Sequence, residues 1–268
     1  MINTRLISFL SVLLLVGCGP TQEEQAAGKL EEAMKLRDSG RLNMARLKLD
    51  TIIDQYSDLT EEVADARRLL EDIELTEQER SLEYLDSAIV EKEAELEPLM
   101  DDFIVSDEYG SEIIYIHRRQ RPEVSYNRTF IRAHLNENGN FYISSRYHGK
   151  EWIRHNQIKV YHAGESVTSE KVPEDGFNNR RFEDGEDKWE IVRYKEGADN
   201  GIVDFIASNV EKPLKVEFIG KKRYYIVMEQ FDKEAIRDAY ETSFVLQELE
   251  GLEKEREEVR KKIRALQR

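Results

Sequence analysis

The sequence changes composition twice along its length, and this order limits the folds that are open to it. Residues 18–103 are rich in Ala, Leu and Glu, and no proline lies between Pro20 and Pro98. Residues 104–231 are rich in Tyr, Phe, Ile and Val, with Gly, Asn and Pro between them, whereas residues 233–268 return to Glu, Lys, Arg and Leu. Helix-forming and strand-forming residues are thus segregated. The sequence therefore predicts an α+β fold, in the order helical, β-rich, helical.

Composition excludes several other classes of protein. The 268 residues include only 5 prolines, 14 glycines and 1 cysteine, so the chain is neither collagen-like nor held by internal disulfides. Its net charge of −15 argues against general nucleic-acid binding, which requires a basic surface. Almost all of the net negative charge lies in residues 18–110.

Residues 18–74 are predicted to form a helical hairpin. Asp38-Ser39-Gly40 separates two stretches of helical periodicity, and Gly40 suits the left-handed conformation at a helix end. The spacing of small and large residues from Ala33 to Ile52 resembles one tetratricopeptide repeat, as found in outer-membrane-assembly lipoproteins. Glu32 and Tyr56-Ser57-Asp58 stand where such a repeat has a leucine and a closing proline, and solenoids need about three repeats. A generic hairpin is the alternative.

Heptad patterns occupy residues 75–103 and 233–268, on either side of the β-rich region. They predict an antiparallel helical pair with a narrow apolar seam, in which basic residues near the C-terminus lie beside acidic residues near position 75. Packing of each helix on the body of the protein is the alternative, and such helices also allow a homo-oligomer. The seam positions are Leu75, Gln78, Leu82, Leu85, Ile89, Lys92, Leu96 and Leu99 in the first segment, and Val245, Leu249, Leu252, Arg256, Val259, Ile263 and Leu266 in the second.

Residues 104–231 are predicted to form a mainly antiparallel β-sandwich or half-open barrel. Asn138-Gly139 marks a hairpin loop, Gly201–Asn209 is predicted to be a short helix capped by Asp199, and residues 173–187 to be a mobile loop. Leu214, Val216 and Phe218 are expected to face the core, with Lys215 and Glu217 facing solvent. The predicted strands are Ile113–His117, Arg128–Leu135, Phe141–Tyr147, Trp152–Tyr161, Ser166–Val172, Lys188–Tyr194, Leu214–Ile219 and Tyr224–Glu229.

Few residues carry a pattern typical of catalysis or metal binding. No nucleophile elbow, phosphate loop, dinucleotide fingerprint or zinc-protease motif is present. The five histidines lack a metal-ligand pattern, so neither a metal nor a cofactor is predicted. Two basic sets between tyrosines are candidate contacts for an anionic lipid headgroup, a glycan or protein carboxylates. They are Arg118, Arg119 and Arg121, and Lys221, Lys222 and Arg223.

The N-terminus is typical of an export signal. Arg5 supplies a positive charge, and Leu6–Val16 are apolar but too few to span a bilayer. Leu15-Val16-Gly17-Cys18 resembles the lipobox of bacterial lipoproteins. The resemblance implies cleavage after Gly17 and lipid on Cys18; the alternative is an ordinary signal peptide with a chance cysteine. Because Gly19, not Asp, follows, the outer membrane is favoured over the inner one if the source is Gram-negative.

These features predict five segments: a signal peptide at 1–17, a hairpin at 18–74, a helix at 75–103, a β-rich domain at 104–231 and a helix at 233–268. The last strands and terminal helix also resemble β-domains of uncharacterised bacterial secreted proteins, a resemblance that implies no activity. We expect a lipid-anchored extracytoplasmic lipoprotein of the cell envelope that acts as a non-catalytic protein-binding or scaffold module. The alternative is an extracytoplasmic enzyme that uses carboxylates of the β-rich domain, with glycan as the candidate substrate.

Overall fold

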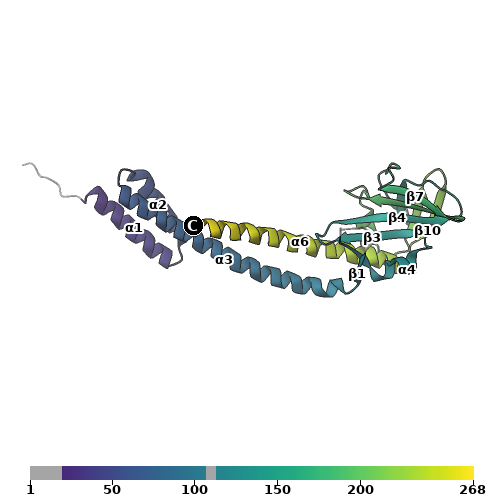
Figure 1. The fold of residues 1–268 in the computed structure, drawn as a ribbon, viewed down its shortest axis with the longest axis horizontal. Coiled ribbons are helices and arrows are strands. Elements are labelled where there is room, and N and C mark those ends of the chain that lie inside the picture. The colour runs from purple at the N-terminus through teal and green to yellow at the C-terminus, as the bar shows by residue number, and fades with distance from the viewer. Residues whose placement is uncertain (1–19, 107–112) are drawn as a thin grey trace, which may run out of the picture. The chain divides into compact units, whose positions relative to one another are not determined.

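The computed structural model describes residues 20–106 and 113–268 (Figure 1). Cys18 and the predicted signal peptide lie outside these residues. The described chain forms two compact units. One comprises the residues up to Ser81 together with Arg260–Arg268, and the other comprises Leu82–Val259. The predicted α+β fold is confirmed, with helices at the N-terminus, two long packed helices and two antiparallel sheets.

The first unit is built on α1 (Gln22–Asp38), α2 (Leu42–Gln55) and the start of α3 (Thr60–Met100). Thr21 begins α1 with a capping box, in which its hydroxyl accepts from the Glu24 backbone N–H at 3.2 Å. Gly40 ends the turn after α1 with φ +75°, as its position predicted. Small residues lie where the helices meet and larger ones fill the space between them. The fully buried members are Ala26, Ala33, Ala45, Leu49, Ile52, Ala66 and Ile73.

The long helices α3 and α6 (Gln230–Leu266) pack antiparallel through the predicted seam within the second unit (Figure 1). Lys92 Nζ lies 2.7 Å from a Glu248 carboxylate oxygen, and Arg256 lies 3.6 Å from Asp86. Every seam position named above is buried or half-buried, including the polar ones. The alternative, in which each helix packs separately, is therefore wrong for this stretch.

The β-rich part contains two sheets, and all strand pairs in them are antiparallel. One has the order β1-β2-β3-β4-β8-β7 and the other the order β10-β9-β5-β6, and neither closes into a barrel. Side chains of both sheets, of α5 (Ile202–Ser208) and of α6 form one apolar core. The strands are β1 (Phe103–Ser106), β2 (Ile114–His117), β3 (Phe130–Asn136), β4 (Phe141–Gly149), β5 (Gln157–His162), β6 (Glu165–Thr168), β7 (Asn179–Asp184), β8 (Asp187–Tyr194), β9 (Lys215–Ile219) and β10 (Arg223–Val227).

Several local predictions need correction. Residues 173–187, predicted as a loop, contain β7, which pairs with β8 despite its charged composition because Phe182 stacks on Trp189 at 5.4 Å. Residues 152–156 are not strand, and the backbone turns there at Arg154 with φ +54°. Glu217 was expected to face solvent, but it is buried. Its carboxylate is satisfied there by an ion pair with Arg223 and a hydrogen bond from the Tyr225 hydroxyl at 3.1 Å.

Short-range features account for three further differences. The strand β1 and the short helices η1 (Arg118–Gln120) and α4 (Pro122–Ser125) were not predicted, because segments of three or four residues carry too little periodicity. The helix α5 was predicted, but Gly201 rather than Asp199 is its N-cap residue. The Asp199 carboxylate still accepts the Val203 backbone N–H at 3.3 Å.

Candidate functional site

The first predicted basic set lies on η1 and the start of α4. Arg118 and Arg119 are exposed, and Arg119 forms an ion pair with Glu234 on α6. Arg121 is also exposed and lies 4.0 Å from Glu123. Arg119 borders an open apolar cavity with Val124, Arg128 and Phe231. This set is therefore partly neutralised by carboxylates of its own surroundings.

The second predicted set occupies the turn between β9 and β10. Lys222 forms an ion pair with Glu151, and Arg223 forms one with Glu217. Lys221 is exposed and has no carboxylate partner among residues 20–106 and 113–268. The structure thus separates Lys221, which lines a cavity, from its two neighbours, which stabilise the hairpin.

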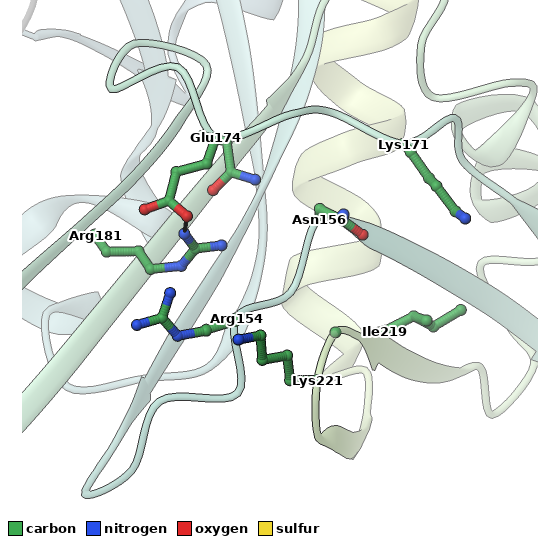
Figure 2. Close-up of a pocket in the computed structure, with 9 residues that line it drawn as sticks. Arg154, Asn156, Lys171, Glu174, Arg181, Ile219 and Lys221 are labelled. Atoms are coloured by element: carbon green, nitrogen blue, oxygen red, sulfur yellow. Dashed lines mark ion pairs between the residues drawn. The ribbon is translucent and has the colours of Figure 1, made fainter.

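Lys221 lines a cavity of about 430 Å³ with three other cationic side chains, as Figure 2 shows. Arg154 comes from the segment before β5, Lys171 from the segment that joins β6 and β7, and Arg181 from β7. Asn156 and Ile219 lie between Lys171 and the other cations in this view. Glu174 is the one acidic residue among the lining side chains. The cavity is therefore strongly cationic, on a chain whose net charge is −15.

A buried carboxylate, Glu190 on β8, holds the segment that carries Arg154. Its two oxygens accept the backbone N–H groups of Ile153, Arg154 and His155 at 2.9, 2.7 and 2.8 Å. Burial raises the pKa of Glu190, but the hydrogen bonds from the His155 ring and from these N–H groups outweigh it, so the pKa lies below its ordinary value. An ionised Glu190 thus fixes residues 153–155 and leaves the Arg154 side chain in solvent.

Gly220 lets the β9–β10 turn approach this segment closely. A Cβ atom at Gly220 would lie 2.4 Å from the Ile153 carbonyl oxygen and 2.5 Å from the Arg154 carbonyl group. Hydrogen bonds join the same segments, from Lys222 N to Ile153 O at 3.1 Å and from Asn156 N to Ile219 O at 3.1 Å. Only glycine fits this contact without displacement. The contact is what brings Lys221 to the rim beside Arg154.

Arg181 also lines the cavity, and its side chain is only 10% exposed. It is ion-paired with Glu174, and its Nη2 donates to the His155 carbonyl oxygen at 3.3 Å. Its Nε lies 3.8 Å from Glu190 and has no hydrogen-bond acceptor in the described chain. The Arg181 guanidinium is thus held between the buried carboxylate of Glu190 and the exposed carboxylate of Glu174.

Behind the cavity, Ser145, His155 and Glu190 form a hydrogen-bonded chain. Ser145 Oγ lies 2.8 Å from His155 Nε2, and His155 Nδ1 lies 2.8 Å from Glu190. Burial lowers the pKa of His155, so the ring is neutral; it donates from Nδ1 and accepts the Ser145 hydroxyl at Nε2. These distances match those of a Ser–His–acid triad. However, all three side chains are fully buried, so the hydroxyl is not accessible to a substrate.

A second cavity brings two carboxylates together. Glu229 and Asp232 line this space of about 170 Å³, but Asp232 is ion-paired with Arg128 and accepts from Gln120 at 2.9 Å. No group of three or more His, Cys, Asp or Glu side chains in the described part of the chain is arranged to hold a metal ion. The cationic cavity is therefore the site whose chemistry is clearest.

Sequence reasoning identified only Lys221 of the four cationic residues at this cavity. Arg154 and Lys171 have no basic Lys or Arg neighbour in the sequence, and Arg181, which follows Arg180, lay in a segment predicted to be a loop. Ser145, His155 and Glu190 come from three separate segments. The only local signal was Gly220 before three consecutive cations, which indicates a tight basic turn.

Comparison with protein-family models, with curated proteins and with solved structures found no match. Among the helices of residues 20–106 and 113–268, none combines the length and the apolar character that a membrane span requires. The site itself therefore carries the evidence for function.

Proposed function

We propose that this chain is a lipid-anchored, extracytoplasmic binding module without catalytic activity, and that its β-rich unit holds an anionic group of its partner in the cationic cavity. The anchor is the lipid expected on Cys18, within the cell envelope and in the outer membrane if the source is Gram-negative. The N-terminal helices and the heptad helices would supply scaffold contacts to protein partners.

One observation carries the binding role: Arg154, Lys171 and Lys221 line one cavity without a carboxylate partner in the described chain. Surface cations are usually solvated or paired, as Lys222 and Arg223 are. A cavity lined mainly by charges of one sign concentrates the electrostatic field and attracts ligands of opposite charge. The arrangement supports anion binding.

The binding role is tested by titrating the full chain, in neutral detergent, with acetate, sulfate and citrate. We expect at least one of these anions to bind in a salt-sensitive manner, and binding to weaken in a variant with Arg154→Gln and Lys221→Gln. Both side chains are exposed, so the variant should keep its fold. Equal binding by this variant and the parent would contradict an anion site here.

The anchor is tested by the Cys18→Ser substitution. Two or three acyl chains hold a protein durably on a membrane, whereas one chain does not. We expect the parent to incorporate a fatty-acid analogue and to sediment with membranes, and the variant to do neither. Label that persists on Cys18→Ser would show that Cys18 is not the attachment point.

An extracytoplasmic hydrolase is the second candidate, because Ser145, His155 and Glu190 have the geometry of a triad. Since the Ser145 hydroxyl is buried, we expect a fluorophosphonate probe for active serines to leave the folded protein unlabelled. Labelling that disappears in Ser145→Ala would favour the enzyme instead. The unfolded chain serves as the control for general reactivity.

A further inference from the structure

We infer that the group bound in the cationic cavity is a phosphate monoester, carried by a soluble metabolite or by a lipid headgroup. This inference rests on the anion-binding role proposed above and specifies its ligand. It follows from the number of charges in the cavity, from the directions in which they approach, and from the acidic residue already inside.

The cavity holds a large uncompensated charge. Glu174 is paired with Arg181, which leaves the positive charges of Arg154, Lys171 and Lys221 without a carboxylate within residues 20–106 and 113–268. A carboxylate or phosphodiester brings one negative charge, whereas a phosphate monoester brings close to two at neutral pH. Because Coulomb energy scales with charge, a dianion gains more from three cations than a monoanion does.

The cations also approach the cavity from several directions. They come from the separate segments that carry Arg154, Lys171, Arg181 and Lys221, and in Figure 2 Arg154, Arg181 and Lys221 lie on one side of Asn156 and Lys171 on the other. A planar carboxylate is best bound by one guanidinium fork from a single direction. A tetrahedral phosphate has three terminal oxygens that can accept from several directions, and lysine ammonium groups bind it as point charges. The surrounding arrangement therefore suits phosphate.

The carboxylate of Glu174 forms an ion pair with the Arg181 guanidinium when no ligand is bound. Glu174 is exposed and lies in the segment that joins β6 and β7. The amide of the buried Asn179, at the start of β7, donates to the Val172 carbonyl oxygen in this segment at 2.8 Å. Glu174 thus acts as an internal competitor for Arg181. A phosphate that displaces it would take its place on Arg181 Nη1, the atom that Glu174 pairs with.

The cavity also has a suitable size. Its volume of about 430 Å³ exceeds that of a lone phosphate ion and lies within the range of about 300–1,000 Å³ typical of small-molecule sites. The ligand is therefore a phosphate monoester attached to a larger body, such as a phosphorylated polyol or a glycerophosphate headgroup.

The test is a calorimetric titration of the full chain in neutral detergent with sn-glycerol 3-phosphate, against acetate and sulfate. We expect glycerol 3-phosphate to bind at least about tenfold more tightly than either, and to lose about tenfold or more in affinity in the Arg154→Gln and Lys221→Gln variant.

Glu174→Gln should strengthen binding several-fold, since it removes the competitor; a purely structural role for Glu174 would not increase affinity. Lys215→Gln is the control for the loss of a surface charge: it removes one positive charge from an exposed position outside the cavity and should leave binding unchanged.

The source of the phosphate is decided by a second arm, in which phosphatidic acid or phosphatidylcholine is added to the same micelles. Tighter binding to phosphatidic acid than to glycerol 3-phosphate identifies a headgroup, and equal binding identifies a soluble ligand; both support the inference. Binding of acetate or sulfate that depends on Lys221 without preference for glycerol 3-phosphate overturns the inference but leaves the anion site. Binding of none of these anions overturns both.

Discussion

At the scale of single residues, the β-rich unit depends on polar groups that are fully buried and satisfied within the protein. Glu190 is ionised and accepts four hydrogen bonds, from three backbone N–H groups and the His155 ring. His134 is equally buried and lies 2.8 Å from Ser144 Oγ. Burial, together with the positive charges of Arg132 and Arg146, holds the pKa of His134 well below its ordinary value. These groups link protonation to folding.

We therefore predict that the free energy of unfolding falls as the pH is lowered from 7 to 5. In this range the unfolded chain protonates His134 and His155, whose pKa values are lowered in the folded state, so protons favour unfolding. Each histidine can contribute up to about 1.4 kcal/mol per pH unit. The raised pKa of Asp232 acts in the opposite sense.

Urea unfolding at several pH values measures this slope. His134→Gln should reduce it, because this substitution removes a buried group whose pKa is lowered in the folded state. A slope that is the same in the parent and in His134→Gln would show that His134 protonates equally in both states.

At the scale of elements, close approaches of backbone depend on a few glycines. Gly139, in the turn between β3 and β4, has φ +73°, and a Cβ there would lie 2.7 Å from the Ser243 carbonyl oxygen on α6. Gln247 of α6 donates to the Gly139 carbonyl oxygen at 2.8 Å. The Asn138-Gly139 turn thus does more than reverse the chain, because it also fixes the hairpin to the long helix.

This contact predicts different costs for alanine at two glycines that both have positive φ. Gly164, with φ +95°, has open space where a Cβ would lie, with no atom within 4 Å, so Gly164→Ala should cost about 1–2 kcal/mol of stability from backbone strain alone. Gly139→Ala should cost a further 1–3 kcal/mol or so from the clash with α6. Urea unfolding of both variants measures the difference. Equal losses would show that the hairpin does not press on α6.

At the scale of the whole molecule, segments from far apart in the sequence belong to one compact unit. Residues 20–81 group with Arg260–Arg268, and all ten strands lie in the chain between α3 and α6. Lys92–Glu248 and Asp86–Arg256 set the antiparallel register of these helices. Continued along both helices, that register places Gln78 opposite Ile263, two seam positions that are half-buried.

Cysteines at Gln78 and Ile263, in a Cys18→Ser background, should therefore form a disulfide within one chain under mild oxidation. Cys18 is the only native cysteine, so the background contains no other thiol. The exposed pair Glu79 and Lys262 is the control and should not crosslink. Non-reducing electrophoresis distinguishes the outcomes. Crosslinks only between chains would indicate a homo-oligomer instead.

The sequence by itself determined the order of helical and β-rich parts, the seam of α3 and α6 and most strands. These depend on periodicity within a single segment, because a helix or strand must present one apolar face to the core. Leu85, Ile89 and Val245, for example, were predicted as seam positions from the heptad pattern, and all three are buried. The division into five segments and the lipid on Cys18 remain predictions.

Only the tertiary structure decided the candidate site. Arg154, Lys171, Arg181 and Lys221 meet because Glu190 holds one segment, Gly220 admits the next, and strand pairing places β7 at the sheet edge. The same holds for Ser145, His155 and Glu190, whose alignment depends on β4 and β8 being neighbours. Convergence of charges from distant segments leaves no local pattern, because it results from how the strands pair and pack and not from the spacing of residues along the chain.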